Sequence, residues 1–120
     1  MVKDSFDIEK FKNPDASYSP VYVWVWNDVC NKEIIDNQLA EMKNLGIRAF
    51  YILPEPKAFR PDSMPTNLTP DYLTDEFFEL CKYAIKQAKA LGMNCWIYDE
   101  GGWPSGSACG KVTEAHPEYS

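Results

Sequence analysis

The chain has 120 residues, of which 45% are hydrophobic, 14% aromatic and 25% charged, and its formal net charge is -6. This composition is typical of one globular domain and excludes a disordered or low-complexity chain. The acidic balance argues against a nucleic-acid partner, and the lack of any run of about 18 apolar residues argues against a membrane-spanning helix.

The N-terminus and the cysteines indicate a cytoplasmic protein. The first residues carry acidic side chains and no apolar stretch, so they do not read as a signal peptide. The cysteines form no Cys-x-x-Cys pair and have no histidine at ligand spacing, which disfavours zinc and thioredoxin-type chemistry. We therefore expect reduced thiols at Cys30, Cys81, Cys95 and Cys109.

A polar lead-in segment over residues 1–20 precedes the first predicted strand, at residues 21–26. Alternating β-branched and aromatic side chains indicate this strand. Residues 32–45 then carry apolar side chains at helical spacing. Asn31 is placed to cap this helix, and Gly46 is placed to end it in a left-handed conformation.

The next predicted strand, at residues 48–53, is apolar, which is typical of a strand buried on both faces. Residues 54–74 follow as an irregular segment with five prolines, too many for a helix or a central strand. Loops longer than about 12–15 residues in compact domains are usually functional or disordered. We expect this proline-stiffened segment to form one wall of a ligand pocket.

A second amphipathic helix is predicted at residues 75–91, with Thr74 as its N-cap and Gly92 beyond its end. It leads into a third strand at residues 94–98. The resulting order, β-α-β-α-β with short helix-to-strand joints, predicts parallel strands joined by right-handed crossovers. Residues 21–120 are thus expected to form an α/β unit whose functional loops gather at the C-terminal ends of the strands.

Polar and aromatic side chains lie at or just after each predicted strand. Carboxylates accept hydrogen bonds from sugar hydroxyls, and aromatic rings stack on the C–H faces of a pyranose, so the combination favours a sugar-binding site. The residues expected to contact substrate are Trp26, Asn27, Glu55, Arg60, Asp99, Glu100, Trp103 and Ser105. Two alternatives stay open: a carboxylate after a strand can simply cap a turn, and a strand tryptophan can belong to the core.

Three stretches carry a resemblance to a known family. They read Tyr-Val-Trp-Val-Trp-Asn-Asp at residues 22–28, Glu-Met-Lys-Asn-Leu-Gly-Ile at residues 41–47, and Trp-Ile-Tyr-Asp-Glu-Gly-Gly-Trp-Pro-Ser-Gly at residues 96–106. Together they resemble the N-terminal part of the catalytic barrel of large bacterial α-L-rhamnosidase-like glycoside hydrolases, often labelled as glycosyl hydrolases with a family 2-type sugar-binding domain. The likeness runs from about residue 11 to residue 119, and its third stretch is the specific one.

The resemblance implies the opening portion of a (β/α)8 TIM-type barrel, incomplete in this chain because a full barrel takes about 250 residues. It also implies hydrolysis of O-glycosidic bonds in plant- or host-derived oligosaccharides by a longer parent chain, with this piece inactive alone. Barrel glycosidases commonly carry their catalytic carboxylates on the fourth and later strands. The main pair is therefore expected outside this chain, and Glu100 is the candidate within it for acid/base work.

The expected partners are a carbohydrate substrate and the remaining domains of the parent chain. No cofactor is expected, although the acidic side chains could hold calcium. Residues 53–56 read Leu-Pro-Glu-Pro where many members of the resembled family carry a histidine-containing segment, so substrate choice is expected to differ from theirs.

Two other classes of protein stay open. One is a non-catalytic carbohydrate-binding module that uses the same aromatic side chains without a catalytic pair. The other is a small flavodoxin-like α/β ligand-binding protein. The second is disfavoured because residues 106–111 are one residue short of a phosphate-binding loop and Val112 replaces the Ser or Thr that would hold magnesium.

Overall fold

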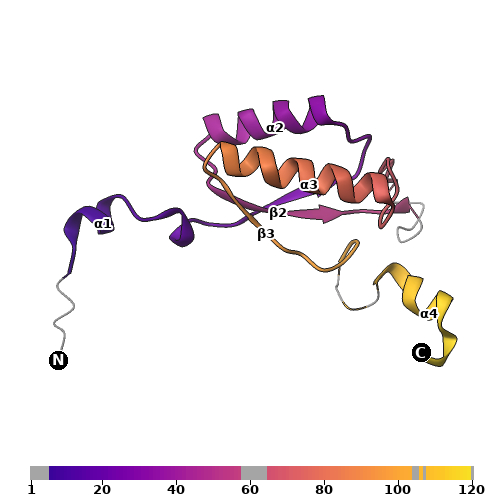
Figure 1. The fold of residues 1–120 in the computed structure, drawn as a ribbon. Helices are drawn as coiled ribbons and strands as arrows, with labels where there is room; N and C mark the ends of the chain where they lie inside the picture. Colours follow the sequence, from indigo (N-terminus) through magenta and orange to yellow (C-terminus); the bar gives the residue numbers. More distant parts are fainter. Residues whose placement is uncertain (1–5, 58–64, 104–105, 107, 120) are drawn as a thin grey trace.

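The computed structural model describes residues 6–57, 65–103, 106 and 108–119. Its centre is a three-stranded sheet in the order β1-β2-β3, with both strand pairs parallel. Two helices lie along one face of this sheet (Figure 1). The central elements are β1 Tyr22–Trp26, α2 Lys32–Asn44, β2 Ala49–Pro54, α3 Asp75–Ala90 and β3 Asn94–Trp96. The predicted α/β class, element order and parallel strands are confirmed.

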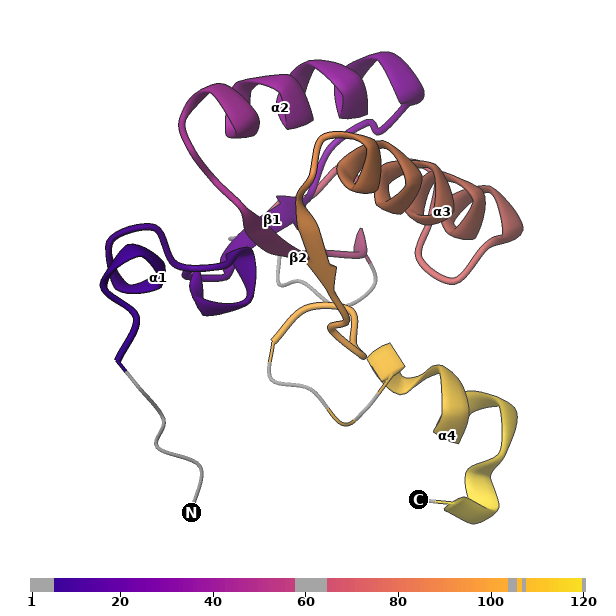
Figure 2. The same ribbon diagram turned by 60° about the vertical axis from the view of Figure 1, so that its left-hand side comes forward.

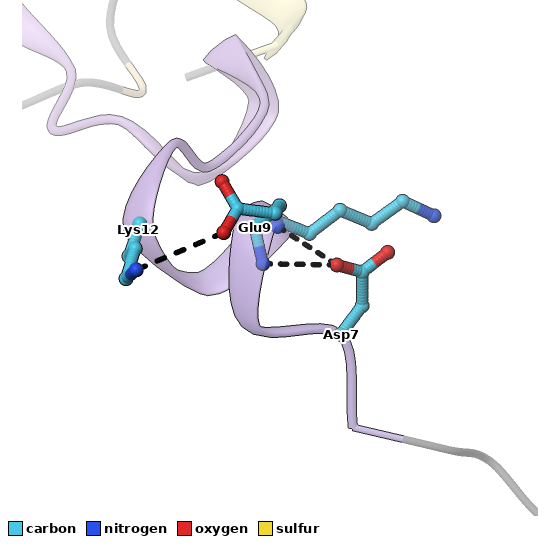
Figure 3. A network of polar contacts seen from close by, with 4 residues as sticks. Asp7, Glu9 and Lys12 are labelled. Carbon is cyan, nitrogen blue, oxygen red and sulfur yellow. Dashed lines mark hydrogen bonds and ion pairs between the residues drawn. The ribbon is translucent and has the colours of Figure 1, made fainter.

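Short elements flank this centre on both sides. They are α1 Ile8–Lys12, η1 Ala16–Tyr18, η3 Ala108–Gly110, α4 Lys111–Ala115 and η4 Pro117–Tyr119. The lead-in segment contains α1, whose first turn is capped by Asp7: its carboxylate accepts the N–H groups of Glu9 and Lys10 at 3.0 and 3.1 Å (Figure 3). The neighbouring Lys12–Glu9 ion pair spans 3.7 Å and is exposed, so it contributes little to stability.

Both long helices begin at the predicted residues and end one residue earlier than predicted, at Asn44 and Ala90. Asn31 caps α2 by accepting the N–H of Ile34, and Thr74 does the same for α3. After α2, Gly46 adopts φ +79°, and the N–H of Ile47 bonds to the carbonyl of Met42 at 2.9 Å. Together with the bond from the N–H of Gly46 to the carbonyl of Lys43 at 3.0 Å, this forms a Schellman motif, which satisfies carbonyls that a helix end leaves free. The end of α3 repeats the same bonds around Gly92.

The core lies between the sheet and the two helices. Ile35 and Leu39 of α2, Ala84 of α3 and Phe50 of β2 are completely buried. The alternate side chains of β1 point into this core, including Trp24, whose indole packs edge-on against Phe50 with ring centroids 5.2 Å apart. The largest buried side chains therefore lie on one face of the sheet.

The thiols at the edge of this core are unpaired. All four cysteines are free. Burial raises the pKa of Cys30 to about 11. Burial is also the main cause that raises the pKa of Cys81 to about 12. Both thiols are therefore protonated at physiological pH. Since only the thiolate is nucleophilic, these two side chains act as neutral packing groups.

The opposite face of the sheet is open in the described part of the chain. Val23, Val25 and Trp96 are 48%, 40% and 54% exposed. Tyr51 and Leu53 of β2, on this same face, are half-buried, because helices cover only the other side of the sheet among the described residues. The chain is also more extended than a compact domain, because its radius of gyration is 17.9 Å and a compact domain of this length has roughly 14 Å.

The third strand is shorter than predicted, ending at Trp96 rather than at residue 98. Beyond Trp96 the chain leaves β2 and returns at Gly102, whose N–H donates to the carbonyl of Pro54 at 2.6 Å. Because Pro54 has no N–H to donate, a longer ladder between β2 and β3 would lack one hydrogen bond at Pro54.

Among the described helices, none has both the length and the apolarity to cross a membrane.

Candidate functional site at the ends of the strands

The C-terminal ends of β1 and β2 are tied together by the segment that returns from the proline-rich loop. The hydroxyl of Thr66 lies 2.6 Å from the carbonyl oxygen of Glu55 and 3.1 Å from that of Asn27 and shares its single proton between them. The N–H of Asn67 donates to the same Asn27 carbonyl at 2.8 Å, and the N–H of Glu55 donates to Trp26 at 2.9 Å. With the Gly102–Pro54 bond, these contacts make one continuous rim across all three strands.

Two predicted site residues on this rim have side chains that solvent can reach. Asn27 is exposed and Glu55 is half-buried. The neighbouring Asp28 instead organises the turn: its carboxylate accepts the N–H of Val29 at 2.8 Å and the amide of Asn67 at 3.1 Å. These hydrogen bonds lower the pKa of Asp28. Asp28 thus takes the turn-capping role that the sequence left open.

Trp26 lies in the core and not on the rim surface. Its side chain is 4% exposed and packs edge-on against Trp24 and Phe77, with ring centroids 5.4 and 5.9 Å apart. Among the described residues its indole N–H has no hydrogen-bond partner. The predicted role as a sugar platform is therefore corrected, because the even-numbered side chains of β1 face the helices.

Glu100 is the most enclosed charged group of the described chain, at 2% exposure. One carboxylate oxygen accepts the N–H groups of Gly101 and Cys109 at 2.9 and 3.0 Å. The other accepts those of Gly106 and Ala108 at 2.8 and 2.7 Å. Hydrogen bonds to an ionised acceptor are roughly twice as strong as neutral ones. Glu100 therefore fixes the described residues of the loop that follows it (101–103, 106 and 108–110), a role that matches the capping alternative.

The loop is shaped to surround this carboxylate. Ala108, Cys109 and Gly110 have consecutive positive φ angles of 48°, 54° and 74°. Left-handed and turn conformations of this kind point successive N–H groups toward one centre and form an anion-binding concavity. The bound anion here is the side chain of Glu100 itself.

One contact fastens the loop to the core, and a second closes the loop on itself. The ammonium of Lys111 donates to the carbonyl of Tyr72 at 2.9 Å, and the thiol of Cys109 donates to the carbonyl of Gly101 at 3.0 Å. Burial, followed by the charge of Glu100, raises the pKa of Tyr72 to about 12. The sequence analysis did not predict a role for Tyr72, Cys109 or Lys111 at this site. For Cys109 and Lys111, their closeness to Glu100 along the chain was a usable signal.

Gly101 has no room for a side chain in this arrangement. A Cβ atom there would lie 2.6 Å from the sulfur of Cys109 and 2.9 Å from a ring carbon of Tyr72. We expect Gly101→Ala to destabilise the fold by about 1–3 kcal/mol through overpacking and to accelerate amide exchange at Ala108 and Cys109. Exchange monitored by NMR checks this. The comparison is Gly46→Ala, which introduces backbone strain at φ +79° but no clash, since nothing lies within 4 Å; equal acceleration at Ala108 and Cys109 in both variants would contradict the contact.

The remaining predicted site residues divide into two groups. Asp99 is exposed and Trp103 is 72% exposed, so both side chains are accessible beside the rim. Arg60 and Ser105 lie outside the described residues, as does part of the expected pocket wall. Tyr98 supports the approach to this region, because its hydroxyl donates to the carbonyl of Gly102 at 3.0 Å and its ring stacks on Tyr51 at 5.5 Å.

The acids of the rim do not form a recognisable metal centre. No group of three or more His, Cys, Asp or Glu side chains that could hold a metal ion occurs within the ranges that the structure describes. Comparison of the chain with protein-family models, with curated proteins and with solved structures found no match. The rim and the sequence motifs that form it are therefore the features of this chain that indicate a function.

Proposed function

We propose that this chain supplies the sugar-binding rim of a glycoside hydrolase that cleaves O-glycosidic bonds in plant- or host-derived oligosaccharides. The observation that carries the proposal is the pairing of a fixed loop with accessible side chains. Glu100 anchors the loop from inside, while Asp99 and Trp103 are exposed beside the strand ends. A carboxylate and an indole held in this way offer a sugar both hydroxyl recognition and ring stacking.

The rigidity of the loop favours a binding role for it. Binding sites gain affinity when their groups need little ordering on contact with the ligand. The hydrogen bonds of Glu100 and the Lys111–Tyr72 contact restrict the backbone on which Asp99 and Trp103 are mounted. In this proposal Glu100 is a positioning residue, and Asp99 is the carboxylate that meets substrate.

The open face of the sheet favours an enzyme of barrel architecture over a self-contained module. Sheets made only of parallel strands occur almost exclusively with both faces covered. Here the second face exposes Val23, Val25 and Trp96. In the proposed barrel this face is the interior, filled by side chains from further strands.

The outer edge of β3 supports the same arrangement. Ile97 is 94% exposed, and Phe78 and Ile85 of α3 are 52% and 50% exposed. A groove of about 280 Å³ runs between these side chains. A further strand beside β3 and a helix against α3 would cover them, and later strands of that kind would carry the catalytic carboxylate pair. Such pairs lie about 5 Å apart in retaining enzymes and about 6.5–9.5 Å apart in inverting ones.

The test is to express the complete gene product that carries this chain and to incubate it with a panel of aryl glycosides and plant and host oligosaccharides. Release of a free sugar is the expected result. Binding of an oligosaccharide without hydrolysis would instead identify a carbohydrate-binding module. Tight binding of a flavin without any sugar affinity would identify a flavodoxin-like protein and overturn the proposal.

A further inference from the structure

A hollow opens between the C-terminal end of β3 and the last helices of the described chain. Its volume is about 420 Å³, within the roughly 300–1,000 Å³ of small-molecule sites. It is lined by Asp99, Glu100, Gly106, Ala108, Val112, Thr113 and Tyr119. Figure 2 shows α4 beyond the end of β3, on the side of the sheet away from α2 and α3. We name this feature the C-terminal hollow.

The walls of the C-terminal hollow are held by contacts already described. Glu100 binds the N–H groups of Gly106 and Ala108, which fixes the floor. Lys111, the first residue of α4, donates to the buried Tyr72. The hydroxyl of Thr113 in α4 donates to the carbonyl of Gly110, the N-cap residue of that helix, at 3.1 Å. The shape of the hollow therefore depends on the core and on the Glu100 loop.

The lining offers the two kinds of contact that a sugar ring uses. Asp99 presents an exposed carboxylate, and such a group accepts hydrogen bonds from hydroxyls. Tyr119 of η4 is 68% exposed, and Val112 of α4 is 47% exposed. His116 packs against the Tyr119 ring with centroids 5.4 Å apart, which leaves the ring available as a platform while restricting its orientation.

Charge in and around the hollow selects against anions. The described residues that line it include two carboxylates, those of Asp99 and Glu100, and no basic side chain. The nearby basic groups are already engaged: His116 pairs with Glu118 at 3.2 Å, and Lys111 donates to a backbone carbonyl and lies over the Tyr72 ring. A carboxylate, sulfate or phosphate on a ligand would therefore meet like charge.

We infer that the C-terminal hollow is a subsite for an uncharged, hydroxyl-rich sugar ring. Asp99 accepts the ring hydroxyls, the Tyr119 ring lies against its C–H face, and uronic acids and sulfated or phosphorylated sugars are rejected. This inference rests on the proposed function and deepens it, because it names the substrate class and two residues that select it.

The experiment measures binding of methyl glucoside, methyl galactoside, methyl rhamnoside, glucuronate and galacturonate to the complete gene product by titration calorimetry. At least one neutral glycoside should bind, and the uronates should bind at least tenfold more weakly. Asp99→Asn should lower the affinity roughly ten- to hundredfold through loss of a charge-assisted hydrogen bond. Tyr119→Ala should lower it roughly three- to tenfold, and Tyr119→Phe, which keeps the ring, should retain it.

The outcomes separate this inference from the proposed function. Hydrolysis or binding of a neutral sugar with unchanged affinity in Asp99→Asn and Tyr119→Ala would overturn the subsite and leave the glycoside hydrolase standing. Uronate binding as tight as neutral binding would overturn the charge selection. Failure of every sugar to bind or react would remove the proposed function and the subsite together. Unaltered thermal unfolding midpoints confirm that the substitutions at these exposed positions act on binding.

Discussion

Glu100→Gln is expected to lower the free energy of unfolding by about 2–6 kcal/mol, because a buried donor left without an acceptor costs about 1–3 kcal/mol and two N–H groups are affected. The carboxylate oxygens of Glu100 accept two backbone N–H groups each, at 2.7–3.0 Å. The amide of glutamine replaces one of these oxygens by a donor, which then faces the N–H groups it cannot bind.

The measurement combines chemical denaturation with amide exchange at Gly106, Ala108 and Cys109. The matched control is Asp99→Asn, which removes one negative charge at the preceding position from an exposed side chain. We expect this control to change stability by less than about 0.5 kcal/mol. If Glu100→Gln has the same midpoint and the same amide exchange as the control, the carboxylate does not hold the loop.

The kinetics of the Glu100→Gln variant distinguish a positioning residue from a catalytic one. If Glu100 positions the loop, the loss in kcat/KM accompanies faster exchange of the loop amides. Glu100→Asp, which keeps the charge on a shorter side chain, should then recover part of both. If Glu100 were the acid or base, turnover would fall while the loop stayed protected, because the reacting group rather than its support would be missing.

The sequence predicted those parts of the fold whose signals are local. The helix spanning Lys32–Asn44 was recognisable because its cap, apolar stripe and terminal glycine all lie within one stretch. The same three signals marked Asp75–Ala90. The bonds that close each helix require only a left-handed residue at Gly46 or Gly92, which glycine adopts without strain.

The side of each strand that is buried could not be predicted in the same way. The strand Tyr22–Trp26 is apolar on both faces, so alternation did not show whether Trp24 and Trp26 or Val23 and Val25 would be covered. The decision comes from packing against α2 and α3, which involves residues far along the chain. Trp26 consequently appeared among the expected substrate contacts although it is 4% exposed.

The role of Glu100 depended on backbone angles that residue types did not reveal. Ala108 and Cys109 adopt positive φ angles of 48° and 54°, which are uncommon for residues other than glycine, asparagine and aspartate. Without these angles the N–H groups would not converge on the carboxylate. A glutamate followed by a glycine-rich stretch did indicate a polar loop at the strand end, but not that the carboxylate would be enclosed by it.

The two faces of the sheet should respond very differently to truncation. Phe50→Ala is expected to destabilise the chain by about 3–5 kcal/mol, because removing a buried phenylalanine loses burial and leaves a cavity. Phe50 is completely buried between Trp24 and the helices. Val25, on the neighbouring strand, is 40% exposed on the open face, so Val25→Ala in the 120-residue chain should cost less than about 1 kcal/mol.

The same pair of variants in the complete gene product tests whether the open face becomes a barrel interior. There Val25 would be enclosed by side chains from further strands, and its truncation should cost clearly more than in the 120-residue chain, by about 1 kcal/mol or more. Phe50→Ala should cost the same in both contexts, since its surroundings are complete among the described residues. Denaturation curves of the four variants and of their two unsubstituted parents give these differences directly. An equally small effect of Val25→Ala in both contexts would show that nothing packs on this face, and the proposed barrel would fall with it.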